Sequence, residues 1–288
     1  DNLGRRSTIT TIFFGNHGNI FFGSSDGNIF YGTTTMQTFS PIVSDIINND
    51  IESLFTDESH LWIGSKDYIT SKSITKLNKQ SLVSESYLFE ETINMTPTSI
   101  FSMYAFKNEL WAGGESLILY LNEKEQFWRT LGQERGVPNG KIYALHGNET
   151  HVWVGSSKGI SRIERATLSE DPIGIEEYFS NMVIYDIEII NGYTWIGTNM
   201  GLYIFSNNDP KLLSLNDIGR KNFPENMNKV TCIQEYNDLI YIISDIGIVK
   251  FNMQEQNLKL IFTSGIYYDK AIYAMNVNEK FIFLGTGD

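Results

Sequence analysis

A repeat constrains this chain more than any other feature of its sequence. An apolar residue, an aromatic residue, a second apolar residue, Gly and Ser or Thr follow one another in segments such as Leu61-Trp62-Ile63-Gly64-Ser65. The aromatic position recurs at intervals of 41 to 49 residues, and four of the five Trp residues occupy it. Its seven copies are Phe21, Trp62, Trp111, Trp153, Trp195, Tyr241 and Phe283. A period of about 20 to 50 residues is typical of repeat architectures.

A second motif keeps an almost constant distance from the first. A β-branched residue, a variable residue, a small or short residue and an apolar residue begin eleven residues before each aromatic residue, or twelve in the first copy, as in Ile142-Tyr143-Ala144-Leu145. Two further runs follow the Gly, as at 159–163 and 176–179. Short runs that are rich in β-branched and aromatic residues and bounded by Gly, Asn and Asp predict β-strands.

Four short antiparallel strands per repeat are typical of a propeller blade. The sequence therefore predicts an all-β fold, a seven-bladed β-propeller with four-stranded antiparallel blades, whose last blade is incomplete within this chain. We expect residues 1–288 to form a single propeller that is a segment of a longer protein. The blades are expected near residues 7–40, 50–90, 99–131, 141–180, 183–216, 229–264 and 271–288.

Each repeated position has an expected role. The first strand should line the central channel, where space is scarce, because its third motif position is always small or short. This position holds Thr11, Ser53, Ser102, Ala144, Asp186, Cys232 and Ala274. The aromatic residue of the second strand should pack between neighbouring blade faces and bury about 200 Å². The Gly that follows should let the chain turn closely.

Composition excludes several classes of function. The chain has 34 acidic residues against 22 Lys and Arg, a net charge of −12, so the dense basic face of a nucleic-acid partner is not expected. No apolar run approaches the roughly 20 residues of a membrane span, so we expect no membrane insertion in this segment. The one cysteine, Cys232, excludes an internal disulfide.

No motif for catalysis is present. A Gly-rich phosphate loop and a G-x-S-x-G segment are both missing. The four histidines, His17, His60, His146 and His151, fall in different repeats and should lie too far apart to share a metal ion. We therefore predict no catalytic residue, no metal site and no cofactor. Asp186 differs from its counterparts, since a carboxylate there must face channel water, bond a neighbouring blade or help to bind a ligand.

Candidate ligand-binding residues lie at the expected channel mouth, in loops between second and third strands and in connections between blades. With Asp186 in the channel, they are Asp67, Tyr68, Arg135, Lys158, Asn199, Met200, Asp245 and Tyr267. Planar aromatic side chains beside Asp, Asn and Arg suit a sugar, whose apolar faces stack and whose hydroxyls need partners. They also suit a peptide or protein surface. For any one of these residues taken singly, an ordinary solvated loop is the favoured interpretation.

The runs at 136–145, 152–160 and 195–203 resemble the two-component regulator propeller repeat. The resemblance extends over all seven repeats, from about Ile9 to Thr286, and weakens where Phe21 replaces Trp and Ile243 replaces Gly. It implies the periplasmic sensor part of a bacterial hybrid two-component system that responds to glycans, with adjacent propeller and β-sandwich domains in the parent protein. A periplasmic or extracellular location and a homodimer formed through the parent protein are implied in the same way.

The sequence thus favours a non-catalytic ligand-recognition propeller, the extracytoplasmic sensor domain of a bacterial two-component regulator. Its expected ligand is a small molecule or glycan, and an oligosaccharide is one candidate. The alternative is a structural or protein-interaction propeller of a secreted or surface complex. A propeller glycosidase or lyase is a third reading, which requires two convergent carboxylates, or a Tyr or His with a carboxylate.

Overall fold

The computed structural model describes residues 8–14, 19–33, 40–41, 51–57, 59–65, 74–81, 83–87, 98–206, 212–213, 227–255, 257–263 and 272–286. Among them are six four-stranded antiparallel sheets and one two-stranded sheet. In each four-stranded sheet the strands are hydrogen-bonded in sequence order, as a propeller blade requires. The chain divides into two compact units, Asp1–Thr130 with Lys270–Asp288, and Leu131–Asp269.

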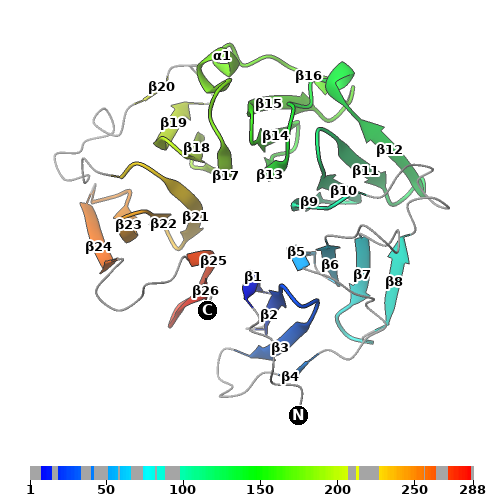
Figure 1. The fold of residues 1–288 in the computed structure, drawn as a ribbon, viewed down its shortest axis with the longest axis horizontal. Helices are drawn as coiled ribbons and strands as arrows, with labels where there is room; N and C mark the ends of the chain where they lie inside the picture. The colour runs from blue at the N-terminus through cyan, green and yellow to red at the C-terminus, as the bar shows by residue number, and fades with distance from the viewer. Residues whose placement is uncertain are drawn as a thin grey trace. The chain divides into compact units, whose positions relative to one another are not determined.

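The first unit contains three four-stranded blades and the two-stranded sheet. Its strands are β1 (Ile9–Phe14), β2 (Asn19–Ser24), β3 (Ile29–Thr33), β4 (Ser40–Pro41), β5 (Ile51–Thr56), β6 (His60–Ser65), β7 (Ile74–Asn78), β8 (Ser84–Tyr87), β9 (Ser102–Phe106), β10 (Glu109–Gly113), β11 (Ile118–Asn122), β12 (Phe127–Leu131), β25 (Ile272–Val277) and β26 (Ile282–Thr286). Within this unit β25, β1, β5 and β9 are successive neighbours (Figure 1).

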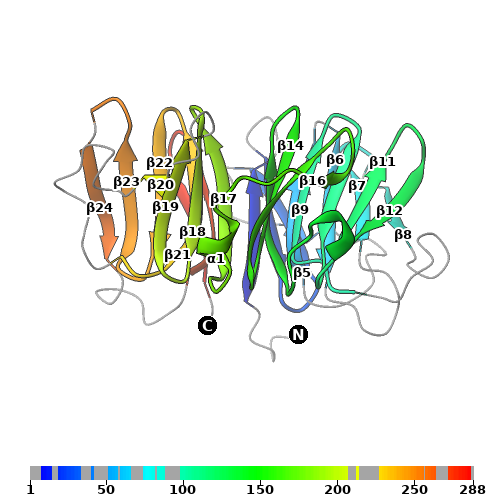
Figure 2. The same ribbon diagram turned by 90° about the horizontal axis from the view of Figure 1, so that it is seen from above.

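The second unit contains three blades, whose inner strands β13, β17 and β21 are successive neighbours. Its elements are the 3₁₀ turn η3 (Gln133–Arg135), β13 (Ile142–Gly147), β14 (His151–Ser156), β15 (Gly159–Glu164), β16 (Ser169–Glu170), α1 (Glu176–Phe179), β17 (Ile184–Ile190), β18 (Tyr193–Thr198), β19 (Gly201–Ser206), β20 (Leu212–Leu213), β21 (Val230–Tyr236), β22 (Leu239–Ser244), β23 (Gly247–Asn252) and β24 (Asn257–Thr263). Figure 2 shows β21 to β24 standing side by side in one blade.

The prediction of seven blades is wrong, because the structure is an all-β propeller with six four-stranded blades. In the described part of the last repeat, residues 272–286, the strands are those of the hairpin β25–β26. The two sequence motifs mark the two inner strands of a repeat and say nothing of its outer strands. The number of motif copies is therefore the number of inner hairpins. It equals the number of blades only where each hairpin is followed by a third and a fourth strand.

An irregularity explains why the second position of the first-strand motif varies. In six of the inner strands the pairing register shifts at this position, for example between Ile142 and Ala144 and between Ile184 and Asp186. A β-bulge leaves one extra residue without a direct partner and increases the local twist. The intervening residues, such as Tyr143 and Tyr185, are thus freed from the alternation that a regular strand imposes.

The repeated aromatic residues pack between neighbouring blades, which confirms their expected role. Trp62, Trp111, Trp153 and Trp195 are all at most 2% exposed. Trp195, for example, packs in one buried cluster with Val230 and Ile233 of the next inner strand. No helix in the described part of the chain has the length and apolar character to cross a membrane.

The repeated Gly has a different role from the expected one. It lies inside the second strand, against the β-branched residue that begins the next inner strand. A Cβ atom at Gly155 would lie 2.5 Å from Cγ2 of Ile184, and one at Gly23 would lie 2.5 Å from Cγ2 of Ile51. Real Cβ atoms do not approach so closely, so Gly is needed for blade-to-blade contact and not for a turn.

We expect Gly155→Ala to lower the free energy of unfolding by about 1–3 kcal/mol, since the added methyl group overpacks a closed contact. Urea unfolding followed by tryptophan fluorescence measures this change. Shortening the opposing side chain in Gly155→Ala/Ile184→Ala should cost less than the sum of the two single changes. An unchanged midpoint for Gly155→Ala would contradict the packing argument.

Candidate functional site

The inner strands β13, β17 and β21 of the second unit are successive neighbours (Figure 1). They carry polar side chains at one register level. Each of these side chains lies opposite the repeated aromatic residue of its own blade. The pairs are His146 with Trp153, Glu188 with Trp195, and Gln234 with Tyr241. Because the three strands share this register and lie next to one another, residues distant in sequence come together on adjacent strands.

A cavity of about 420 Å³ is present at this level, and we call it the inner-strand pocket. Its polar lining consists of His146, Glu188, Asn191, Gln234 and Glu235. The pocket lies where inner strands turn into second strands. The predicted channel mouth is at the other end of the blades, where second strands turn into third strands.

Glu188 and His146 form a pair within the pocket, with Oε2 of Glu188 3.3 Å from Nδ1 of His146. Burial raises the pKa of Glu188 well above its ordinary value, and the charges of Asp186 and Glu235 raise it further. Burial lowers the pKa of His146 to about 4. Both shifts favour the neutral pair, in which the Glu188 carboxyl group donates its proton to Nδ1.

Asp186 lies two residues before Glu188 on β17 and connects two blades. Its Oδ1 accepts the N–H of Ile187 at 2.9 Å, and its Oδ2 accepts the N–H of Ile233 on β21 at 2.6 Å. Burial raises the pKa of Asp186 to about 6, although these two hydrogen bonds oppose the shift. The carboxylate therefore bonds the neighbouring blade, one of the three roles that the sequence left open.

The chemistry of the inner-strand pocket is that of a hydrogen-bond acceptor site with some donor capacity. Carboxyl and amide oxygens of Glu188, Glu235, Gln234 and Asn191 can accept protons from hydroxyl or amine groups, while the two amides can also donate. Across the described residues, no group of three or more His, Cys, Asp and Glu side chains could hold a metal ion. The acceptors and donors of this lining suit a polar organic ligand.

Two of the predicted site residues, Asn199 and Asp245, form hydrogen bonds with the connections between blades. Oδ1 of Asn199 accepts the N–H of Val183 at 2.8 Å, and the N–H of Asn199 donates to the carbonyl of Val183 at 3.1 Å. Asp245 forms the same reciprocal pair with Lys229, at 3.3 and 3.1 Å. A short polar residue two positions after the repeated Gly197, or after Ile243 where it replaces the Gly, could have indicated this role.

The other predicted residues lie on several separate loops and make local contacts. Nη1 of Arg135 donates to Oγ of Ser169 at 3.0 Å. Lys158 and Met200 each donate a backbone N–H to the hydroxyl group two residues earlier, at 2.9 Å, and the Met200 side chain is exposed. Asp67, Tyr68 and Tyr267 lie outside the described residues. The ligand-binding roles of all these residues stay predictions.

Sequence reasoning did not assign a ligand-binding role to His146, Glu188, Gln234 or Glu235. A usable signal existed, because each inner strand has one residue that pairs with the repeated aromatic. In the described blades this position is Phe13, Phe55, Tyr104, His146, Glu188, Gln234 and Asn276. It is aromatic in three consecutive repeats and polar in the next four, a contrast that points to different environments.

A scan against protein-family models and a search of curated proteins both find no match. Solved structures do resemble the chain. The extracellular domain of BT4673, a proposed hybrid two-component system of B. thetaiotaomicron, superposes with a TM-score of 0.75 at 18% identity, covering 98% of this chain and 37% of that one. The extracellular domain of BT3049, of the same kind and organism, gives 0.70 at 16% identity, covering 98% and 39%.

A third similar structure is the WD40 β-propeller domain of Doa1, with a TM-score of 0.73 at 14% identity, covering 99% of this chain and 91% of that one. Identities this low show the fold, which is a β-propeller. The chain spans less than two fifths of the length of the two-component extracellular domains that it matches.

The buried Asp186 should make folding pH-dependent. Its pKa rises from an ordinary 3.8 in the unfolded chain to about 6 in the folded state. Above pH 6 the folded state therefore contains an ionised Asp186 whose partial burial lowers the free energy of unfolding. Raising the pH from 4 to 7 should therefore cost up to about 3 kcal/mol of stability at this group. Asp186→Asn cannot titrate, and its unfolding free energy should fall less over that range in urea titrations. An equal fall in both proteins would refute this prediction.

Proposed function

We propose that this chain is a non-catalytic ligand-recognition propeller that binds an oligosaccharide at the inner-strand pocket. The observation that carries the proposal is the convergence of Glu188, Gln234, Glu235 and Asn191 around one cavity. Sugar hydroxyls donate and accept hydrogen bonds. Carboxylate groups supply acceptors for them, and side-chain amides supply both donors and acceptors. Each satisfied hydrogen bond contributes about 0.5–1.5 kcal/mol net, so several together support a specific complex.

The neutral Glu188–His146 pair suits an uncharged ligand better than a metal ion. In this pair the carboxyl group of Glu188 donates its hydrogen bond to Nδ1 of His146, and its carbonyl oxygen can accept one from a ligand hydroxyl. The partial burial of both side chains makes such a hydrogen bond stronger than one made in water. The same burial penalises an unmatched polar group, which gives the pocket selectivity among sugars that differ in one hydroxyl.

In the parent protein we propose the role of an extracytoplasmic sensor domain of a bacterial two-component regulator, in the periplasm or outside the cell. The support is the fold that the chain shares with extracellular domains of proposed two-component systems. Ligand binding would act on the adjacent propeller or β-sandwich domains of the parent protein. It would do so by favouring one of two domain arrangements, to the extent that the ligand's affinity for them differs.

Calorimetric titration with a panel of neutral oligosaccharides tests the proposal. Glu188→Gln, which keeps the shape but removes the shared proton, should weaken binding of any hit about 10- to 100-fold. The control is Glu177→Gln, an exposed residue of α1 outside the pocket lining, which should bind as the unaltered protein does.

Two results would contradict the proposal. One is a bound oligosaccharide whose affinity is the same in Glu188→Gln. The other is the release of reducing ends from the bound sugar, since a carboxyl group with a raised pKa is also what a glycosidase uses as its acid. Hydrolysis would overturn the non-catalytic assignment while leaving the pocket as the binding site.

A further inference from the structure

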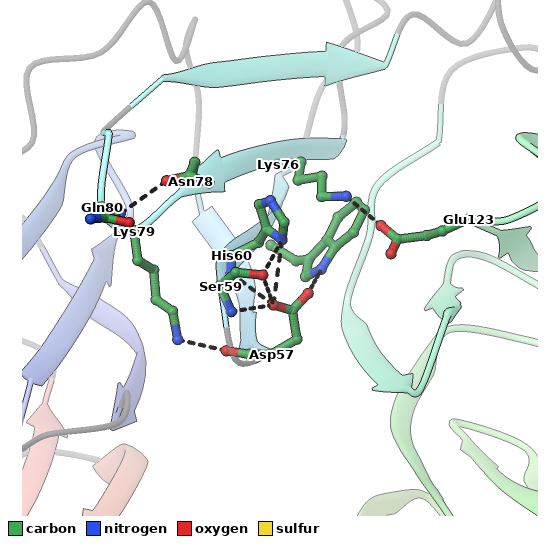
Figure 3. A network of polar contacts seen from close by, with 9 residues as sticks. Asp57, Ser59, His60, Lys76, Asn78, Lys79, Gln80 and Glu123 are labelled. Carbon is green, nitrogen blue, oxygen red and sulfur yellow. Dashed lines mark hydrogen bonds and ion pairs between the residues drawn. The ribbon is translucent and has the colours of Figure 1, made fainter.

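The carboxylate of Asp57 completes a turn of the β5–β8 blade. Its Oδ1 accepts the backbone N–H groups of Ser59 at 2.8 Å and His60 at 2.7 Å (Figure 3). Its Oδ2 accepts Nε1–H of Trp62 at 3.0 Å. Both oxygen atoms of this acid are therefore engaged within its own blade.

The same turn is built a second time with an amide in place of the carboxylate. Oδ1 of Asn148 accepts the backbone N–H groups of Thr150 and His151, both at 2.9 Å. We call the turns that end at His60 and His151 the histidine turns. Because an amide serves as well as a carboxylate here, these turns need an oxygen acceptor and not a negative charge.

Two further carboxylates are matched by basic side chains. Glu123 forms an ion pair with Lys76 of the preceding blade (Figure 3). Asp171 forms an ion pair with Arg162, and its Oδ2 also lies 3.0 Å from Nε2 of His151. A basic group thus balances each of these acids, which is the usual condition of a partly buried charge.

Glu235, near the end of β21, differs from these acids. Its Oε1 accepts the backbone N–H of Asp238 at 2.9 Å. In the described part of the chain, no Lys, Arg or His side chain forms an ion pair with it. The negative charge of Glu235 can therefore attract a positively charged group of a ligand.

The place of Glu235 in its repeat does not call for an acid. Glu235 directly follows the inner-strand residue that pairs with the repeated aromatic residue. In the other repeats this position is uncharged, and it holds Phe14, Thr56, Ala105, Gly147, Ile189 and Val277. A blade can thus be built without a carboxylate at this position, so blade packing does not explain the acid.

Glu235 acts on the same pocket as Glu188. Burial raises the pKa of Glu188 most, and the charges of Asp186 and Glu235 raise it further, so these groups lie close enough to interact. Glu235 is also part of the lining of the inner-strand pocket, which contains no Lys or Arg side chain. The carboxylates there would attract a cationic ligand group and repel an anionic one.

We infer that the oligosaccharide of the inner-strand pocket carries a free amino group, whose ammonium forms an ion pair with Glu235. The neutral Glu188–His146 pair binds an uncharged hydroxyl group of the same ligand. The ligand class is therefore an amino sugar whose amine is not acetylated, and acidic sugars are excluded. The inference rests on the proposed function, because it specifies the ligand of the same pocket.

Three tetrasaccharides with one β-1,4 backbone test the inference in calorimetric titrations of the whole chain at about pH 6, where a sugar amine is protonated. They are the glucosamine tetramer, its N-acetylated form and cellotetraose, which has hydroxyl groups in place of the amines. The amine form should bind about tenfold more tightly than the other two, because hydrogen bonds between charged groups are the stronger ones. The advantage should shrink at about 1 M salt, which screens the charges.

Two variants locate the amine. Glu235→Gln keeps an oxygen for the N–H of Asp238 but removes the charge, so it should bind the three sugars with similar affinity. The control Glu255→Gln removes an equal charge from an exposed residue outside the lining, and it should keep the preference for the amine. Putrescine supplies ammonium groups without a sugar, so binding as tight as that of the glucosamine tetramer would overturn the assignment to a glycan.

The outcomes separate this inference from the proposed function. Equal affinities for the three tetrasaccharides that still fall in Glu188→Gln would overturn the amino-sugar inference alone. A preference for the amine that persists in Glu235→Gln would have the same consequence. If none of the three binds, the inference is wrong, and the proposed function falls with it unless another neutral oligosaccharide binds.

Discussion

Close contact between a glycine of one blade and a β-branched residue of the next underlies the rest of this structure. Gly23 meets Ile51, Gly64 meets Ile100, Gly155 meets Ile184 and Gly197 meets Val230. Each pair comes from the two repeated sequence motifs, so the motifs are the two sides of one interface. Because interiors are packed to crystal-like density, a contact this tight tolerates no added methyl group. Within each unit it brings neighbouring inner strands together, and the pockets depend on that spacing.

Neighbouring inner strands place side chains of distant residues at one level, where their identity decides what each region can do. On β1, β5 and β9 of the first unit this level is aromatic, since the ring centres of Phe13 and Phe55 are 5.7 Å apart and those of Phe55 and Tyr104 are 6.1 Å apart. In the second unit, His146 and Glu188 occupy the equivalent positions and form a polar pair. The same backbone thus supports an apolar contact or an acceptor site, according to one residue in each repeat.

Differences between equivalent positions of the repeats also indicate which residues have a special role. The histidine turns at His60 and His151 share their backbone hydrogen bonds, but in the described parts of the two blades it is His151 whose Nε2 meets a carboxylate. The basic residues opposite the tryptophans also differ, since Lys76 pairs with the next blade and Arg162 pairs within its own. Comparing one repeat with another inside a single chain therefore distinguishes groups that complete the fold from groups that remain available to a ligand.

The sequence alone determined the all-β class, the spacing of the strands and the burial of the tryptophans, because short-period apolar patterns and turn residues act locally. It did not determine the number of complete blades, since outer strands such as β20 and β24 share no motif. The sequence did not determine the site either, because His146, Glu188 and Gln234 are separated by 42 and 46 residues. From the sequence, Asp186 is identified only as an unusual residue of the channel. Tertiary structure decided both, because only the packing of one blade on the next gives such residues common neighbours and a shared buried environment.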